Sequence, residues 1–202
     1  DIRRGKPSTH KKFGEATAVL AGNSLLTLAF EIIADKKNYL SFKQKNEIIN
    51  LLAHCSGHTG IAGGQELDLK YEKRRKKLNQ IISMQRKKTG KLFSFCLQSV
   101  AIVGERSPKE KLLLGNIGED IGLLFQLKDD FLDVKGSKKL VGKPIQKDKK
   151  KGKSTLINLI GYKNSYKYAE KLKKKILLKL IKHGKNAQYL KETINFIFGR
   201  NF

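Results

Sequence analysis

The feature that most constrains the fold is one long helical pattern in the second half of the chain. Ser107, Pro108 and Glu110 have the spacing of a capping box, in which Ser is the N-cap, Pro the first helical residue and Glu the third. The apolar residues that follow recur at intervals of three and four. The sequence therefore predicts a long helix that begins at Pro108 and ends near Gly136.

The rest of the chain shows the same periodicity. Helical patterns cover residues 13–34, 48–52, 74–89, 92–103, 154–160, 166–181 and 190–198. We expect the pair Gly63-Gly64 to end the second of these patterns and Thr89-Gly90 to end the third. No segment alternates apolar and polar residues with a period of two. The predicted fold class is all-α, with residues 1–202 forming a single domain.

Charge and cysteine content exclude several classes of protein. The chain carries 43 Lys and Arg against 18 Asp and Glu, a formal net charge of +25, but no known nucleic-acid-binding module can be identified in it. We therefore expect no nucleic-acid partner and place most lysines on the surface. The two cysteines indicate neither a disulfide framework nor a zinc site, which favours a cytoplasmic protein. We expect no transmembrane segment.

One face of the long helix is unusual for a purely structural helix. Gly118, Gly122, Gln126, Asp129 and Asp133 follow one another at spacings of four, four, three and four, and so lie on one side. Each Gly within a helix costs about 1 kcal/mol relative to Ala, and the two carboxylates repel each other. We infer that the glycines leave space for a cavity lined by carboxylates, while the opposite side supplies the packing through Leu124, Leu127, Phe131 and Leu132.

Three aspartates at the end of this helix form a D-D-x-x-D pattern. Asp129, Asp130 and Asp133 offer hard oxygen ligands one helical turn apart, and Mg²⁺ commonly takes one or two carboxylates together with waters and substrate phosphates. Taken alone, the pattern also fits a solvated acidic turn. The glycine face and the following stretch of residues 135–153, with nine Lys and one acid, favour a site for a phosphate ester.

Several strings of residues carry a resemblance to a known family. In chain order they are Arg3-Arg4-Gly5-Lys6-Pro7-Ser8-Thr9-His10, Phe13-Gly14-Glu15-Ala16, Leu20-Ala21-Gly22, Gly63-Gly64-Gln65-Glu66-Leu67-Asp68-Leu69, Lys88-Thr89-Gly90 and Phe125-Gln126-Leu127-Lys128-Asp129-Asp130-Phe131-Leu132-Asp133. Together they resemble the trans-isoprenyl diphosphate synthases (polyprenyl synthetases), and within that family the bacterial farnesyl diphosphate synthase type. The match covers essentially the whole chain.

The resemblance implies a fold, a reaction and a set of partners. It implies a helical bundle around a central cavity, a cytoplasmic homodimer, and three Mg²⁺ ions, with Mn²⁺ as an alternative ion. The implied reaction joins isopentenyl diphosphate to an allylic diphosphate, such as dimethylallyl or geranyl diphosphate, to give farnesyl diphosphate. Ionisation of the allylic diphosphate precedes condensation, and loss of a proton completes the reaction.

The resemblance also assigns roles to individual residues. Asp129, Asp130 and Asp133 are the second aspartate-rich motif, with Asp129 and Asp133 the direct metal ligands. Arg3 contacts the allylic diphosphate and Arg4 the isopentenyl diphosphate, because guanidinium pairs bidentately with phosphate oxygens.

Five further residues have roles that the resemblance implies. Lys88 binds the allylic diphosphate and, with Thr89 and Gln126, directs dipoles at the developing cation. Lys143 and Lys153 match two loop lysines that close over the diphosphate and exclude water.

The sequence departs from the family pattern in several places. The first aspartate-rich motif is absent, since the sequence begins just after it, and we expect these residues to be the C-terminal two thirds of a longer chain that is inactive without the rest. Asn23, Gln146 and the ending Arg200-Asn201-Phe202 replace the usual Asp, Gly and terminal Lys. The alternatives are a geranylgeranyl diphosphate synthase, a non-catalytic subunit of the same fold and, more remotely, a basic nucleic-acid-binding helical protein.

Overall fold

The computed structural model describes residues 1–3, 5–74, 76–135 and 155–201, and most of this part of the chain is helical. The α-helices are α1 (Thr9–Phe13), α2 (Glu15–Ala34), α3 (Phe42–Ser56), α4 (Ile61–Tyr71), α5 (Leu78–Gln85), α6 (Lys91–Val103), α7 (Pro108–Lys135), α10 (Leu156–Ile160), α11 (Tyr162–Lys179) and α12 (Gln188–Gly199). η1 (Arg86–Gly90) is a π-helix, and η2 (Ile181–Ala187) is a 3-10 helix. The strands β1 (Ile2–Arg3) and β2 (Lys6–Pro7) form a short antiparallel hairpin. The all-α prediction is confirmed.

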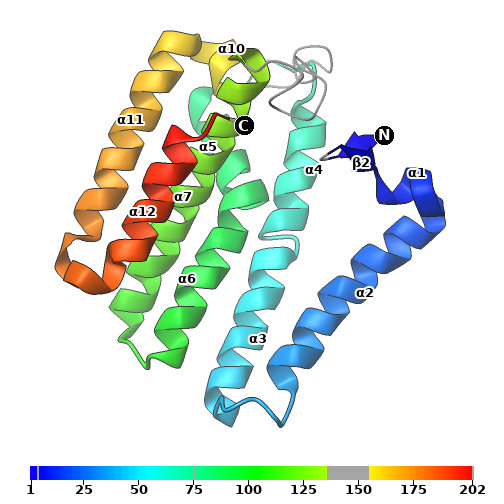
Figure 1. Ribbon diagram of the computed structural model, residues 1–202, viewed down its shortest axis with the longest axis vertical. Coiled ribbons are helices and arrows are strands. Elements are labelled where there is room, and N and C mark those ends of the chain that lie inside the picture. The colour runs from blue at the N-terminus through cyan, green and yellow to red at the C-terminus, as the bar shows by residue number, and fades with distance from the viewer. Residues whose placement is uncertain (4, 75, 136–154, 202) are drawn as a thin grey trace.

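Helix α7 is the central element of the bundle. It contacts α5, η1, α6, α10, α11 and α12. In Figure 1, α11 and α12 lie on one side of α7, and α3, α4 and α2 lie on the other. The hairpin, the end of α4, the end of α12 and α10 all lie toward one end of the bundle (Figure 1). Residues from distant parts of the sequence therefore gather at that end.

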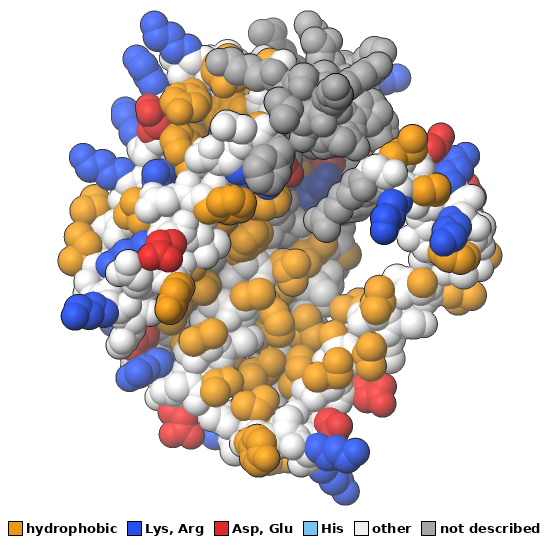
Figure 2. Space-filling model, in the orientation of Figure 1, with side chains coloured by type: hydrophobic (Ala, Val, Ile, Leu, Met, Phe, Trp, Pro, Cys, Tyr) orange, Lys and Arg blue, Asp and Glu red, His pale blue; other side chains and the backbone are white. Residues whose placement is uncertain are grey.

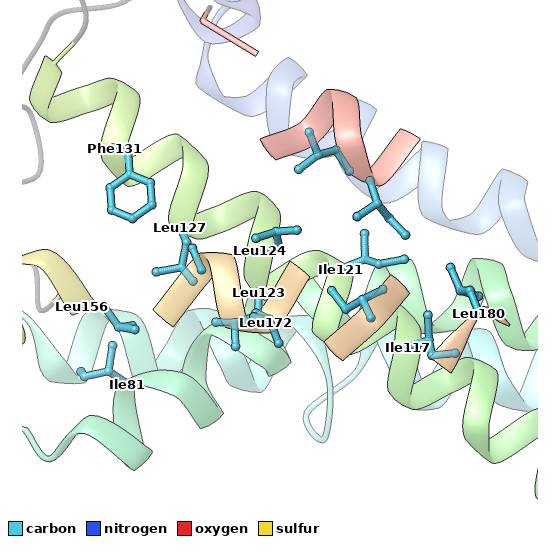
Figure 3. Packing of buried hydrophobic residues seen from close by; sticks show 14 of the residues in the cluster. Ile81, Ile117, Ile121, Leu123, Leu124, Leu127, Phe131, Leu156, Leu172 and Leu180 are labelled. Carbon is cyan, nitrogen blue, oxygen red and sulfur yellow. The ribbon is translucent and has the colours of Figure 1, made fainter. Parts of the chain in front are cut away.

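The hydrophobic core surrounds α7. Leu123, Leu124 and Leu127 have no exposed surface, and Phe131 is almost fully buried. They pack with apolar residues of α5, α10, α11 and α12 in one cluster (Figure 3). Burial of this kind contributes about 1.5–3 kcal/mol for each large apolar side chain. The predicted packing side of the long helix is confirmed for Leu124, Leu127 and Phe131, whereas Leu132 is half-buried.

The ends of α7 agree with the sequence prediction. The helix begins at Pro108 and ends at Lys135, one residue before Gly136. The backbone N–H of Glu110 donates to the Ser107 hydroxyl at 3.4 Å, as expected for an N-cap. The Glu110 carboxylate lies 3.6 Å from Lys182 and 3.8 Å from His183 of η2. The N-terminal turn of α7 is thereby tied to the segment that joins α11 and α12.

Two predicted helix ends are wrong. Gly63 and Gly64 lie within α4, and the break falls earlier, between α3 and α4. The helix that was expected to stop at Thr89-Gly90 continues, since α5, η1 and α6 follow one another from Leu78 to Val103 without a gap. Gly90 keeps helical dihedral angles (φ −63°, ψ −33°), so it does not end the helix. A π-turn accommodates an extra residue without breaking the rod.

The glycines of α7 allow the neighbouring helix to approach closely. A Cβ at Gly118 would lie 2.5 Å from the carbonyl oxygen of Phe93, and a Cβ at Gly122 would lie 2.5 Å from the Cα of Gly90. A Cβ at Gly90 would lie 3.1 Å from the Cα of Glu119. The prediction that these α7 glycines leave an open space is therefore wrong, because the backbone of η1 and α6 fills that space.

Helix α2 differs from the others in its burial. It has no buried residue, and its exposed apolar side chains include Leu20, Leu25 and Leu28. Figure 2 shows hydrophobic side chains along this helix and on the side of the molecule that faces it. A window of α2 has a mean hydropathy of 1.6, which makes it long and apolar enough to cross a membrane by length and composition. The expectation of no transmembrane segment assumed that no apolar run is long enough to cross a membrane, and for α2 this assumption is wrong by length and composition.

Replacing Gly122 by Ala should destabilise the protein, because the new methyl group would meet the Gly90 backbone. Overpacking of this size costs roughly 1–3 kcal/mol, and we expect the melting temperature to fall by about 2–10 °C. The matched control is Gly22→Ala in α2, where a Cβ would meet nothing within 4 Å. The control should leave the melting temperature unchanged or raise it slightly. Equal melting temperatures in circular dichroism for the two variants would contradict the close-contact interpretation.

Candidate active site

The π-helix η1 is fixed against α7 by charge pairs at its two ends. Arg86 donates to Asp120 and lies 3.6 Å from Glu119, and Lys91, just after η1, lies 2.6 Å from Glu119. Lys179 of α11 lies 2.9 Å from Asp120, whose side chain is 2% exposed. A buried carboxylate is tolerated when it is paired in this way. The network sets the rotation of η1 relative to α7.

Two of the predicted catalytic residues meet at this contact. The Thr89 hydroxyl donates to the side-chain oxygen Oε1 of Gln126 at 3.2 Å, across the interface between η1 and α7. Both side chains are half-buried. Gly122 lies one turn before Gln126 and allows η1 to come near enough for this bond. The structure therefore brings Thr89 and Gln126 together, and their catalytic roles stay predictions.

Lys88 is paired with an aspartate of α4. Its Nζ donates to Oδ2 of Asp68 at 2.5 Å, and Asp68 is buried. Gly64 lies one turn before Asp68, and a Cβ there would lie 2.2 Å from the backbone nitrogen of Lys88. Gly64 thus lets α4 approach η1 and place Asp68 beside the lysine. Sequence reasoning gave Asp68 no role, although an acidic residue within an apolar helix pattern was the available signal.

The carboxylate of Asp130 accepts from two glutamine side chains. The amide Nε2 of Gln126 donates to Oδ1 of Asp130 at 3.0 Å, and Gln85 donates to Oδ2 at 3.5 Å. The Asp130 side chain is almost completely buried. Both carboxylate oxygens of Asp130 thus accept hydrogen bonds from glutamine side chains, and its part in metal binding stays a prediction.

Asp129 is paired with the end of the chain. Nη2 of Arg200 lies 2.5 Å from Oδ1 of Asp129, and the guanidinium stacks over the Phe125 ring with its carbon 4.1 Å from the ring centroid. Sequence reasoning noted Arg200 only as part of an ending that lacks Lys. No local pattern links residue 200 to residue 129, so only the packing of α12 against α7 could reveal this pair.

The electrostatic field at this end of α7 is mixed. Burial lowers the pKa of Lys128, and the Arg200 cation lowers it further. The carboxylates of Asp129 and Asp133 lie one helical turn apart, with the Asp129 side chain one third exposed and Asp133 almost buried. Positive and negative groups therefore alternate within a few residues.

The donor set fits a hard divalent cation that is shared with other ligands. Two carboxylates one turn apart are the protein contribution that Mg²⁺ typically takes. Within the described residues, no three His, Cys, Asp or Glu side chains converge to form a complete metal site. Asp129 and Asp133 are thus suited to a cation whose remaining ligands are waters or phosphate oxygens.

The other predicted substrate-binding residues are less fully placed. Arg3 lies in β1, paired in register with Lys6, at the same end of the bundle (Figure 1). Arg4, Lys143 and Lys153 lie outside the residues that the structure describes. Their roles stay predictions.

Comparison with known proteins identifies the family. The polyprenyl synthetase family model matches residues 1–197. The chain belongs to the polyprenyl synthetase family. It is 36% identical to the farnesyl diphosphate synthase of Escherichia coli, covering all of this chain and 69% of that protein, and 38% identical to that of Bacillus subtilis, covering 79% and 54%.

A solved polyprenyl synthetase has the same fold. An FPP/GFPP synthase from Zymomonas mobilis superposes with a TM-score of 0.85 at 35% identity, covering 97% of this chain and 66% of that chain. A geranyltransferase from Helicobacter pylori, solved with magnesium and isoprenyl diphosphate, superposes with a TM-score of 0.83 at 31% identity, covering 97% and 64%. The chain spans about half the length of several curated relatives that it matches.

Replacing Gln126 by Leu should cost more stability than replacing Thr89 by Val. The Leu variant removes both the bond from Thr89 to Gln126 and the bond from Gln126 to the buried Asp130 carboxylate. The Val variant removes one bond and leaves no buried charge. We expect losses in the free energy of unfolding of about 1–3 kcal/mol for Gln126→Leu and about 0.5–1.5 kcal/mol for Thr89→Val. Urea unfolding measures both values, and the reverse order would contradict the assigned network.

Proposed function

We propose that this protein is a short-chain trans-prenyltransferase that condenses isopentenyl diphosphate with dimethylallyl or geranyl diphosphate to give farnesyl diphosphate. The single observation that carries the proposal is the hydrogen-bonded link from Thr89, the neighbour of Lys88, through Gln126 to Asp130 within the Asp129–Asp133 turn of α7. Family membership and the farnesyl diphosphate synthases among the relatives support it.

The carboxylates provide the metal-binding part of the site. Asp129 and Asp133 would hold Mg²⁺, with Mn²⁺ as an alternative, and three ions are proposed for the whole enzyme. When bound, the metal would stabilise the negative charge that develops on the leaving diphosphate. Asp130 keeps Gln126 in place from one turn away.

In this proposal Lys88 binds negative charge, whereas Thr89 and Gln126 stabilise positive charge. The Lys88 ammonium pairs with phosphate oxygens, and its bond to Asp68 limits the positions it can take. The Thr89 hydroxyl donates its hydrogen bond to Gln126, so its oxygen lone pairs can face positive charge. The Thr89 hydroxyl oxygen and the Gln126 amide oxygen belong to fixed dipoles, which stabilise a developing carbocation without reorganising. Lys143 and Lys153 are proposed to close over the diphosphate and exclude water, which would otherwise react with the carbocation.

Two neighbouring functions share the same observations. A geranylgeranyl diphosphate synthase would use the same site with a longer product, and the Arabidopsis thaliana relative named geranylgeranyl pyrophosphate synthase 4 is 37% identical over all of this chain. A non-catalytic subunit would keep the fold and lose turnover. Gas chromatography of the dephosphorylated products from radiolabelled isopentenyl diphosphate distinguishes farnesol, geranylgeraniol and no product.

We further propose that the protein is a cytoplasmic homodimer. The support is the exposed apolar side chains of α2, a helix that contains no Lys or Arg, because contiguous exposed apolar surface often marks an interaction site. Sedimentation velocity of the intact gene product, without detergent, tests the dimer. A monomer that extracts only with detergent would support a membrane location for α2 instead.

In the intact gene product, Asp129→Asn and Asp133→Asn should each reduce Mg²⁺-dependent turnover by roughly a hundredfold or more. The fold should survive, because Asn has the size of Asp and keeps a side-chain oxygen that can accept a hydrogen bond, as Asp129 does from Arg200. The matched control is Glu66→Gln on α4, whose exposed carboxylate lies 3.0 Å from the exposed Lys70. Turnover of both Asp variants within twofold of the control would refute the metal assignment.

Lys143 and Lys153 should differ from other lysines of the same stretch. If they close over the diphosphate, replacing either by Ala should raise KM or lower kcat by about tenfold or more. Lys138→Ala and Lys150→Ala should change little, because exposed charges contribute weakly and are screened by salt. Similar small effects in all four variants would mean that the stretch is only a solvated run of charge.

A further inference from the structure

The side chain of Arg200 contacts α7 at Asp129, the first residue of the aspartate-rich motif. The backbone turns out of α12 at this residue, whose N–H still donates to the Phe196 carbonyl at 2.8 Å. From there the guanidinium reaches α7, where Nη2 lies 2.5 Å from Oδ1 of Asp129 and 3.4 Å from the Phe125 carbonyl oxygen. The flat face of the guanidinium covers the Phe125 ring. One side chain therefore satisfies three separate groups of α7.

The environment makes this pair stronger than an ordinary surface ion pair. The Arg200 side chain is only 14% exposed, and Nε is buried without a hydrogen-bond partner among the described residues. Charge pairs that are partly shielded from water are screened less by salt than exposed ones.

We propose that Arg200 is the internal counter-ion of Asp129 and that a divalent cation must displace it to bind there. A guanidinium and a divalent cation cannot share one carboxylate oxygen without strong repulsion at such short range. Each therefore weakens the binding of the other, and the coupling is reciprocal. Arg200 thereby sets how tightly the motif holds metal before substrate arrives. This inference rests on the proposed metal role of Asp129.

The test is Mn²⁺ binding to the intact gene product without substrate, followed by the loss of the free-ion signal in electron paramagnetic resonance. Arg200→Gln should bind Mn²⁺ about fivefold more tightly, the factor that corresponds to about 1 kcal/mol. Arg106→Gln is the matched control, because it removes the same charge from an exposed position at the other end of α7. It should leave the affinity unchanged.

A second pair of variants distinguishes an effect of Arg200 that acts through Asp129 from a general effect of removing one positive charge. In an Asp129→Asn background, Arg200→Gln should no longer change Mn²⁺ affinity, since the carboxylate that the two cations compete for is gone. Arg200→Lys keeps the charge and should bind Mn²⁺ nearly as the wild type does. This variant keeps the test decisive if the Gln variant disturbs the fold, which melting in circular dichroism would reveal.

Three results would overturn the inference. They are an Arg200→Gln affinity equal to that of the Arg106 control, a weaker affinity, or a gain that persists in the Asp129→Asn background. The proposed function fails separately, through unchanged product formation by Asp129→Asn. Lost product formation in that variant together with an unchanged Mn²⁺ affinity in Arg200→Gln would reject the counter-ion role and leave the prenyltransferase assignment intact.

Discussion

The structure depends on one close contact, between the glycine side of α7 and the continuous rod formed by α5, η1 and α6. At Gly118 and Gly122 the two backbones are so near that no side chain fits between them. A gain in dispersion contacts along this seam compensates for the poor helix propensity of Gly. The seam also sets the distance over which Thr89 reaches Gln126. The same residues that allow packing therefore place the polar groups.

A second property follows from that packing, namely that the polar groups of the site are paired within the chain. Lys88 pairs with Asp68, Arg200 with Asp129, and Gln126 with Asp130. Unpaired charges in a partly buried site would cost several kcal/mol each. An anion or cation that binds at these groups must therefore exchange the existing pairs for new ones. Such a site binds charge without exposing isolated charges beforehand.

The sequence predicted the parts of this arrangement that depend on local signals. The start of α7 at Pro108 followed from capping chemistry, and Asp129 and Asp133 followed from spacing along one helix. The role of the glycines did not, because Gly90 is compatible with both a helix end and a close contact, and only the neighbouring helix decides between them. Arg200 and Asp68 were missed for the same reason, since their partners are distant in sequence.

Helix α2 differs from the seam between α7 and the α5–η1–α6 rod, because its apolar face is not covered by the described chain. The Thr27 hydroxyl of α2 donates to the Asn23 carbonyl, and none of the residues of α2 is buried, so its apolar side chains lie open. An apolar surface of this kind gains free energy only when something covers it. The seam at α7 is already closed by the chain itself, whereas the face of α2 is suited to a second surface. Stability at α7 is thus intrinsic to the described chain, and stability at α2 depends on what covers that face.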